Sequence, residues 1–313
     1  MKHAWCVLLL SASASAQEPV TLTGGHKREA TCVAFSPDGK LLVSGGADGS
    51  VAFWDVAAKK AVEIVASKAG ALNSVAFSPD GTKLAFGEMY NKVRLWDVAS
   101  RKETAVLSGH GGAVNGVVFL PDGKTLVSVS TDQSIRFWDA PTGAERETIK
   151  IHKYKITGIA VSRDGKWLAT GNDGGLVKIC ELPGGKEMSE IKVASGITSL
   201  AFSPDSSTLA VASKEMSVGF WDVDPATWKS REAETDRLKS YVVSLAFAPD
   251  GKALAYGTHS GLVVLSHPKE RMSESLDKSP DRPVTGVAFS PDGSRVAASC
   301  MDRNIRLWTM RKK

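Results

Sequence analysis

Histidine has the widest range of possible chemistry in this sequence, because its side chain acts as a base, a metal ligand or a hydrogen-bond partner. Two of the six histidines, His26 and His110, follow a glycine. Neither belongs to a His-Glu-x-x-His zinc motif, and no Gly-x-Ser-x-Gly turn presents a serine nucleophile. The sequence therefore contains none of the histidine motifs that mark a metalloprotease or an α/β-hydrolase.

Cysteine and phosphate-loop patterns are equally weak. The four cysteines show no Cys-x-x-Cys spacing that would predict a zinc site. Asp-Gly-Lys-Thr at 122–125 resembles the end of a phosphate-binding loop, but no glycine stands five positions before Gly123. No EF-hand spacing is present. We therefore expect no cofactor, no metal ion and no catalytic residue.

The residues that do recur belong to a repeated unit. An apolar residue followed by a turn resembling Ser-Pro-Asp-Gly occurs seven times, at intervals of 41 to 45 residues. We call these apolar residues the anchors; they are Phe35, Phe77, Phe119, Val161, Phe202, Phe247 and Phe289. Nineteen residues after each anchor stands a second fixed position, occupied by Trp54, Trp96, Trp138, Cys180, Trp221, Ser266 and Trp308.

Each unit reads as a small antiparallel sheet. Alternating apolar residues before the anchor, as in Val33-Ala34-Phe35, predict a strand with one buried face. Pro-Asp-Gly then predicts a tight turn, because proline presets φ and glycine accepts a positive φ. A second apolar strand, a polar corner, a third strand carrying the Trp and a more polar fourth strand follow. One such sheet buries too little apolar surface alone, so neighbouring sheets must stack.

A period of 40–45 residues closed by Trp-Asp resembles the WD-repeat propellers, here in a bacterial, secreted style. The resemblance extends from about Val20 to Trp308. It implies an all-β, seven-bladed β-propeller with four-stranded blades, which forms a single domain over residues 17–313. Only five residues follow Trp308, so the resemblance implies that the N-terminal strand, within 19–23, completes the last blade.

Closure of such a ring brings the first and last blades together. Cys32 and Cys300 then lie in neighbouring blades, which leaves two alternatives. In an oxidising compartment they could form a disulfide. Otherwise they are two separate buried thiols.

The resemblance also implies a role for the histidines of the Gly-His pairs. In the family this histidine bonds a Ser or Thr of the second strand and an Asp of the following corner, and the Trp indole N–H joins them. Blade one offers His26, Ser44, Asp48 and Trp54, and blade three offers His110, Ser128, Asp132 and Trp138. His, Ser and Asp together also resemble a hydrolase triad. We expect structural hydrogen-bond networks that stiffen the blades.

Binding is expected where the repeats differ. The Pro-Asp-Gly turns are nearly uniform, so the opposite face should carry the contacts. Contact positions of the family include the residues four before each anchor, namely Thr31, Asn73, Asn115, Thr157, Thr198, Val243 and Thr285. Large or charged residues gather in blades four to seven, and we predict partner binding by Tyr154, Lys155, Asp173, Lys214, Tyr241, His259, Arg282 and Met301. Unconstrained drift of these positions is the alternative explanation.

The first sixteen residues resemble a secretory signal peptide. A basic start at Lys2 precedes the apolar run 4–10, and Ala14-Ser15-Ala16 has the form of a cleavage site. We expect residues 1–16 to be removed and the protein to be exported, either to the periplasm or out of the cell. The apolar run is too short to span a membrane, and no later stretch is long enough.

The remaining features favour a binding protein. The formal net charge is +5 and no Lys/Arg stripe with interleaved aromatic residues is present, so we expect no nucleic-acid partner. The leading prediction is a monomeric, non-catalytic scaffold for one or more proteins. A propeller-type hydrolase or lactonase is one alternative, and a binder of an envelope polysaccharide is the other.

Overall fold

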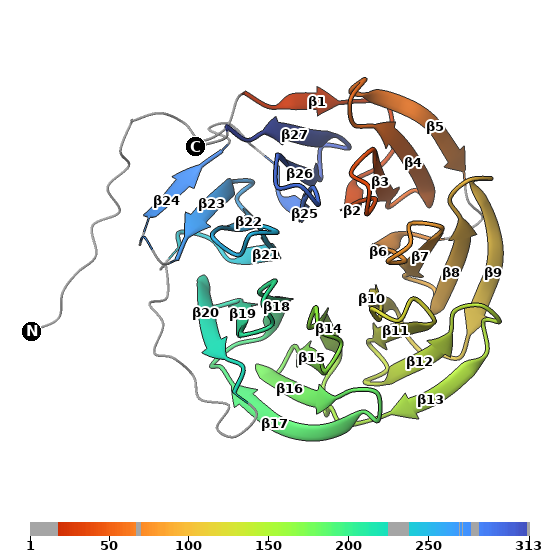
Figure 1. Cartoon of the computed structure of the whole chain (residues 1–313), viewed down its shortest axis with the longest axis vertical. Helices are drawn as coiled ribbons and strands as arrows, with labels where there is room; N and C mark the ends of the chain where they lie inside the picture. The colour runs from red at the N-terminus through yellow and green to blue at the C-terminus, as the bar shows by residue number, and fades with distance from the viewer. Residues whose placement is uncertain are drawn as a thin grey trace, which may run out of the picture.

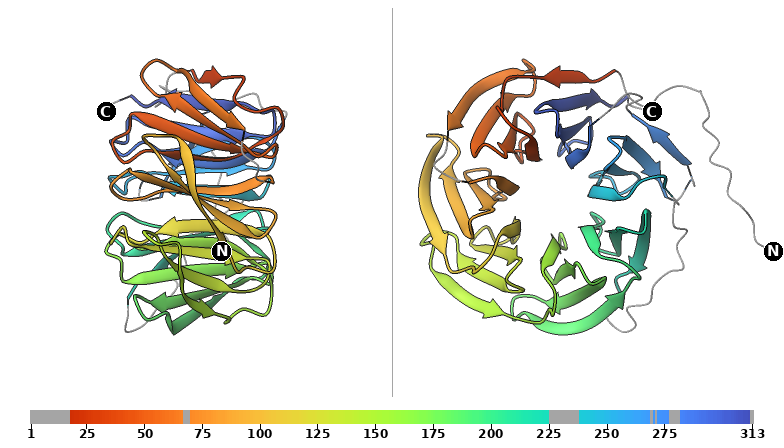
Figure 2. Two further views of the ribbon diagram at one scale, coloured as in Figure 1. Left: turned by 90° about the vertical axis from the view of Figure 1, so that its right-hand side faces the viewer. Right: turned by 180° about the vertical axis from the view of Figure 1, so that it is seen from behind.

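The computed structural model describes residues 18–66, 70–224, 238–268, 270, 272–276 and 282–311. This part of the chain contains 27 strands and no helix. The strands form seven antiparallel sheets, which are arranged around a central axis as the blades of a propeller (Figure 1). Figure 2 shows the resulting disc from its edge and from behind. The predicted seven-bladed, all-β fold is confirmed.

From the axis outward the strands of blades one to six follow chain order, and in blade seven β25, β26 and β27 are followed by β1. The first strands are β2 (Ala30–Phe35), β6 (Leu72–Phe77), β10 (Val114–Phe119), β14 (Ile156–Val161), β18 (Ile197–Phe202), β21 (Val242–Phe247) and β25 (Val284–Phe289). The second strands are β3 (Leu41–Gly46), β7 (Lys83–Glu88), β11 (Thr125–Ser130), β15 (Trp167–Asn172), β19 (Thr208–Ser213), β22 (Leu254–Thr258) and β26 (Arg295–Cys300). Every anchor is thus the last residue of a first strand.

The third strands carry the Trp-Asp positions. They are β4 (Ser50–Asp55), β8 (Lys92–Asp97), β12 (Ile135–Asp139), β16 (Leu176–Glu181), β20 (Ser217–Asp222), β23 (Val263–His267) and β27 (Ile305–Thr309). The fourth strands are β5 (Lys60–Ala66), β9 (Lys102–Ser108), β13 (Glu145–Ile149), β17 (Lys186–Lys192), β24 (Met272–Ser275) and, in blade seven, β1 (Val20–Leu22). Blade five has three strands in the described residues.

The N-terminal strand closes the ring. Strand β1 pairs antiparallel with β27, with Val20 opposite Leu307 and Leu22 opposite Ile305. Leu22 is buried against residues of blades one and seven, including Trp54 and Leu307. The predicted completion of the last blade is confirmed, and β1 covers the outer edge of β27, which could otherwise pair with another chain. The predicted signal peptide, residues 1–16, lies outside the described residues.

The hydrophobic core is divided among the junctions between blades. Seven clusters of buried residues are present in the described chain, and each is shared by two neighbouring blades. Each buried tryptophan of a third strand belongs to the cluster shared with the preceding blade; Trp138, for example, lies in one cluster with Leu95 of blade two. No blade therefore has a complete core of its own, which explains why the repeats are stable only as a ring.

The Pro-Asp-Gly turns also connect neighbouring blades. A Cβ added to the turn glycines would lie 3.4 to 3.8 Å from the proline ring of the adjacent turn at Gly39, Gly81, Gly123, Gly165, Gly251 and Gly293. The exception is the junction of blades four and five, where Arg163 replaces the proline and Ser206 the glycine. There the backbone N–H of Asp164 donates to Ser206 Oγ at 3.2 Å. A polar contact thus replaces the Pro–Gly contact.

Candidate functional site

The antiparallel blades place their connections on two opposite faces. The turn face carries the turns between first and second strands, residues 36–40, 78–82, 120–124, 162–166, 203–207, 248–253 and 290–294. The corner face carries the corners between second and third strands, residues 47–49, 89–91, 131–134, 173–175, 214–216, 259–262 and 301–304, and the loops that lead into the first strands. All eight predicted partner-binding residues lie on the corner face.

Exposed large apolar side chains mark the corner face. Among the described residues they are Met89, Tyr90, Tyr154, Met216 and Met301. The other exposed large apolar residues lie on fourth strands at the outer rim: Val62, Ile64, Val106, Met188 and Met272. None of them lies on the turn face. Since Tyr and Met are enriched in protein interfaces, the corner face has the composition of a binding surface.

Two tyrosines of this face rest on glycine backbone. A Cβ added to Gly174 would lie 2.4 Å from Cδ2 of Tyr154, and one added to Gly70 would lie 2.2 Å from Cδ2 of Tyr90. The two pairs use the same two positions of their blades, seven residues before and thirteen residues after the anchor. In blade four the tyrosine comes first and the glycine second, and in blade two the order is reversed. Each ring is 60 to 69% exposed yet held in place. Such fixed aromatic rings lose little entropy on binding.

Blade two also carries large exposed residues, in addition to those of blades four to seven that the sequence predicts as contact residues. Met89 and Tyr90 are 55% and 69% exposed at the corner of that blade. The signal was present in the sequence, because both residues stand where most other blades have small or polar ones. What could not be read is that Gly70 leaves room for the Tyr90 ring.

Three of the predicted partner-binding residues are paired with one another. Asp173 accepts from Lys214 of blade five, and its other oxygen lies 3.3 Å from Lys155 Nζ. These bonds, led by the one from Lys214, lower the pKa of Asp173. The trio leaves one net positive charge and links blades four and five.

The two predicted residues of blade six also contact each other. The rings of Tyr241 and His259 are stacked, with centroids 4.7 Å apart and an interplanar angle of 17°. His259 is exposed and Tyr241 is partly buried. The last two predicted residues, Arg282 and Met301, line a pocket beside blade one.

The hydrogen-bond network of blade one is continuous. Trp54 Nε1 donates to Ser44 Oγ at 2.9 Å, and Ser44 Oγ lies 2.7 Å from His26 Nε2. On the other side of the ring, His26 Nδ1 lies 2.7 Å from Ser50 Oγ, which donates to Asp48 at 2.5 Å. All groups are satisfied when His26 is neutral with its proton on Nδ1. Ser50 thus stands between His26 and Asp48, whose carboxylate is 3.9 Å from the ring.

Blade three has the same network, except that its histidine contacts the aspartate directly. His110 Nε2 lies 2.7 Å from Ser128 Oγ, which accepts from Trp138 Nε1 at 2.8 Å. His110 Nδ1 lies 3.0 Å from both Asp132 Oδ2 and Ser134 Oγ. Ser50 and Ser134, fifteen residues after their anchors, were not identified from the sequence as members of these networks.

In blade four the histidine ring carries its proton on the other nitrogen. Asn172 Oδ1 accepts from the backbone N–H groups of Gly174 and Leu176, which fixes the orientation of the amide. Its Nδ2 therefore donates to His152 Nδ1 at 2.9 Å. The ring proton of neutral His152 must then be on Nε2, which lies 2.8 Å from Thr170 Oγ1.

Burial holds these histidines neutral. Desolvation lowers the pKa of His26 to about 4 against the raising effect of Asp48, and burial together with Lys178 lowers that of His152 to about 4. Burial also lowers the pKa of His110, although Asp132 opposes it. Ser44 and Ser128 have no exposed surface, and each Oγ already accepts from a tryptophan. The arrangement therefore does not present a serine nucleophile to a substrate.

Blade two lacks the histidine network and contains an ion pair in its place. Phe86 occupies the position of Ser44, and Trp96 Nε1 is buried without a hydrogen-bond partner. Glu88 is only 2% exposed; its carboxylate accepts from Arg94 Nε at 3.0 Å. Arg94 also donates to Glu103 at 2.7 Å. A buried ion pair therefore links the second and third strands of this blade.

The residues four before the anchors connect the blades. Each first strand has a register shift there, which leaves this residue outside the ladder. Asn115 donates to Ile156 O at 2.6 Å, Thr157 to Ile197 O at 2.6 Å and Thr285 to Ala30 O at 2.6 Å. Thr31 and Asn73 bond the next blade in the same way. These positions were expected to contact a partner, but in five blades their side chains bond the next blade.

Other chemistry is limited in the described part of the chain. No three side chains of His, Cys, Asp or Glu in it are grouped so that they could hold a metal ion. Cys32, Cys180 and Cys300 are buried thiols that form no disulfide, so the two-thiol alternative holds for Cys32 and Cys300. Burial raises the pKa of Cys32 to about 12 and that of Cys180 to about 11, which makes both unreactive at neutral pH. The described residues include no helix that is long and apolar enough to cross a membrane.

Comparison with known proteins gives the same architecture. The family described as Nucleolar protein 10-like, N-terminal domain matches residues 15–179. The WD domain, G-beta repeat family matches residues 185–222 and 274–309.

Individual relatives are similar over shorter stretches. WD repeat-containing protein 18 of Rattus norvegicus is 42% identical over 50 residues, which are 16% of this chain and 12% of the rat protein. The Homo sapiens protein of the same name is 40% identical over 50 residues, which are again 16% of this chain and 12% of the human protein. WD repeat-containing protein SL1-17 of Schistosoma mansoni is 32% identical over 113 residues, 36% of each chain. The matched lengths are thus 12 to 36% of these relatives. With its seven blades and both family matches, the chain belongs to the WD-repeat β-propellers, and its first half matches the Nucleolar protein 10-like, N-terminal domain family.

Proposed function

We propose that this protein is a non-catalytic scaffold that binds a protein partner through its corner face. The observation that carries the proposal is the distribution of exposed apolar side chains. Five large ones lie on the corner face and none on the turn face, within the described ranges. Exposed apolar groups on a rigid, preformed surface are typical of partner-binding sites.

The proposed contact residues are Tyr154, Lys155, Asp173, Lys214, Tyr241, His259, Arg282 and Met301, and we add Met89 and Tyr90 of blade two. Tyr90 and Tyr154 would act as aromatic anchors, because their rings are exposed and fixed against glycine backbone. WD-repeat propellers are typical protein-interaction scaffolds, and both family matches support this general role for the chain.

A non-catalytic role is supported by the state of the groups that resemble a triad. The serine hydroxyls are fully buried and already bonded, and the histidines are neutral parts of closed networks. We also propose that residues 1–16 direct export and that residues 17–313 act as one propeller domain. The support for export is the basic start, short apolar run and Ala-Ser-Ala segment.

The test compares substitutions of exposed side chains on the corner face with a matched substitution on the outer rim. The purified full chain is used to capture proteins from an extract of its native source, and captured proteins are quantified by mass spectrometry. Tyr154→Ala and Met301→Ala on the corner face are expected to reduce capture of the main partner at least about tenfold. Met188→Ala on the outer rim, where the side chain is 37% exposed, is the control for the 43% exposed Met301.

Equal capture by all variants would overturn the proposal. Loss of capture by Met188→Ala alone would instead assign binding to the rim. Circular dichroism and the unfolding midpoint of each variant must match those of the original protein. The substituted side chains are exposed, so their removal is expected to change stability by less than about 0.5 kcal/mol.

A further inference from the structure

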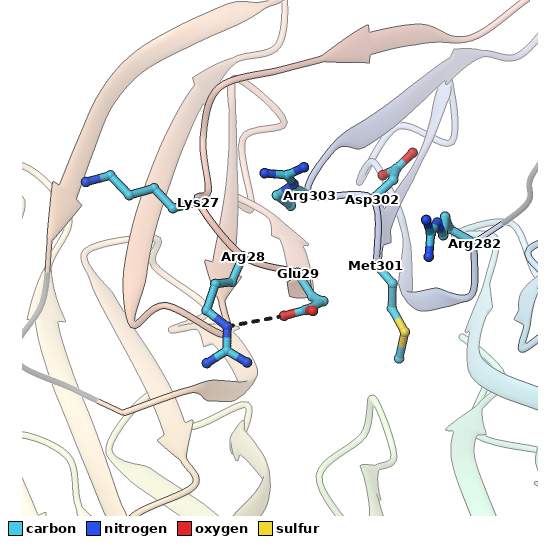
Figure 3. A pocket seen from close by; sticks show the side chains of 7 residues that line it. All are labelled: Lys27, Arg28, Glu29, Arg282, Met301, Asp302 and Arg303. Atoms are coloured by element: carbon cyan, nitrogen blue, oxygen red, sulfur yellow. Dashed lines mark ion pairs between the residues drawn. The ribbon is translucent and has the colours of Figure 1, made fainter.

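A charged pocket lies at the junction where the ring closes. It has a volume of about 360 Å³ and opens on the corner face between blade seven and blade one (Figure 3). Its lining comes from the loop before β2, the loop before β25 and the corner after β26. The lining residues are Lys27, Arg28, Glu29, Arg282, Met301, Asp302 and Arg303. Four of these side chains are cationic and two are anionic.

Both carboxylates of the pocket already have cationic partners. Glu29 lies 3.6 Å from Arg28 Nε, as the dashed line in Figure 3 marks. Asp302 accepts from Arg306 Nη2 at 2.7 Å, and Arg306 is outside the pocket lining. Lys27, Arg282 and Arg303 form no ion pair with any described carboxylate. Among the described residues, the pocket therefore has positive charge that no carboxylate neutralises.

The backbone at Arg303 has the left-handed conformation that this corner has in every blade. Arg303 has a φ of 76°, and every blade has a positive φ at this corner position, fourteen residues after its anchor. Three blades place a glycine there: Gly49, Gly175 and Gly261. Glycine adopts this conformation without steric cost, whereas a long side chain is disfavoured by about 1 kcal/mol. Three further blades have Asn91, Gln133 and Met216 there, so Arg303 is the one cationic residue at this position, and its side chain lines the pocket.

We propose that this pocket binds the carboxylate or phosphate of an acidic segment in the protein partner. Arg282 and Arg303 would form charge-assisted hydrogen bonds with the anion, and Lys27 would add its charge. Met301, 43% exposed, would pack against an apolar neighbour in the same segment. The proposal rests on the proposed function, for which it specifies the chemistry of the partner.

A protein segment fits this pocket better than a nucleic acid does. Glu29 and Asp302 interrupt the cationic lining, so the pocket offers no continuous basic surface along a phosphate backbone. The lining contains no aromatic ring on which a base could stack. An isolated acidic side chain, in contrast, needs only the two guanidinium groups and the apolar surface beside them.

The experiment measures binding of short fluorescein-labelled probes to the purified full chain by fluorescence anisotropy. The probes are a peptide with Asp, Glu and Leu, the same peptide with one phosphoserine, and the same peptide with Asn and Gln replacing the acids. A single-stranded DNA oligonucleotide is the fourth probe. We expect the two acidic peptides to bind at least about tenfold more tightly than the neutral peptide and the oligonucleotide.

Arg303→Gly separates binding from folding. Glycine suits the left-handed corner, so the variant should be as stable as the original protein or more stable. We expect it to lose affinity for both acidic peptides by at least about tenfold, and Arg282→Ala to do the same. Lys40→Ala removes one exposed charge from the turn face and is the matched control, expected to leave affinity unchanged.

Equal affinity of Arg303→Gly and the original protein would overturn the proposal, as would tighter binding of the oligonucleotide. Equal binding of the acidic and neutral peptides would do the same. None of these results decides whether the corner face binds a partner, because that is measured by capture with the Tyr154→Ala variant, whose side chain lies outside the pocket lining. Failure of the pocket and failure of the scaffold are therefore separable.

Discussion

The three buried histidines show how one residue type is used in two protonation patterns. His26 accepts through Nε2 from Ser44 and donates through Nδ1, whereas His152 accepts through Nδ1 from Asn172. In each case the partner of one nitrogen decides which nitrogen keeps the proton. The common result is a neutral ring that joins the second strand to the corner, with no spare group for catalysis.

The neutral rings predict that stability falls in mild acid. The folded-state pKa of His26 and His152 is about 4, below the ordinary value of 6.5, so the unfolded chain takes up protons that the folded chain excludes. The stabilisation is complete above pH 6.5 and is lost as the pH falls toward 4. By linkage, we expect a loss of roughly 1 to 2 kcal/mol per histidine between pH 7 and pH 5.

Urea unfolding followed by tryptophan fluorescence at the two pH values measures this loss. Nuclear magnetic resonance of the imidazole nitrogens checks the cause: the proton should be on Nδ1 in His26 and on Nε2 in His152. Equal stability at pH 7 and pH 5, or histidine rings that titrate above pH 6, would show that these networks are not closed around a neutral ring.

At the scale of elements, the bulge in each first strand determines how blades are joined. It frees one side chain to bond the next blade, as Thr157 does with Ile197 O. The junctions that follow blades five and six differ. Thr198 Oγ1 is buried without a partner, and Val243 has no hydroxyl. There Ser199 and Ser244 accept instead from backbone N–H groups of Leu245 and Val287, at 3.1 Å each.

We therefore expect the same Thr→Val substitution to change the free energy of unfolding differently in blades four and five. Thr157→Val removes the donor and leaves Ile197 O unpaired, so we expect a loss of about 1 to 2 kcal/mol in the free energy of unfolding. Thr198→Val removes a buried hydroxyl that has no partner and is expected to be neutral or stabilising. Denaturant unfolding of both variants measures the difference; equal destabilisation would mean that the interblade bond contributes nothing.

The sequence predicted those elements whose signals are local. Phe35 with its Pro-Asp-Gly turn, and Trp54 nineteen residues later, determine strand ends and spacing through neighbouring residues alone. The contribution of Ser50 to the His26 network could not be predicted, because it depends on how a corner folds back. The acceptors of Asn115 and Thr157 lie about one repeat further along the chain, so they become visible only when the blades are stacked.

The candidate site shows the same limit. Large residues at variable positions, such as Tyr154 and Met301, were identified from their type. The pairing of Asp173 with two lysines, the glycine under the Tyr154 ring and the pocket around Arg303 all depend on distances between separate loops. Spacing in one repeat does not contain that information.

At the scale of the whole molecule, the two faces of the disc have different compositions because different loops form them. The turn face consists of similar Pro-Asp-Gly turns that contact one another around the ring, so its residues serve the architecture. The corner face consists of loops that differ in every blade and carries the exposed Tyr and Met side chains. Closure by β1 makes this face continuous and places the charged pocket at the seam.

The most direct test of the scaffold account is photocrosslinking from both faces in the native cell. Benzoylphenylalanine is placed in turn at Tyr90, Tyr154 and Met301 on the corner face and at Lys40, Lys124 and Lys252 on the turn face, all exposed positions. The account predicts a discrete protein adduct from the corner-face positions and none from the turn-face positions. Adducts from the turn face alone, or equally from both faces, would contradict it.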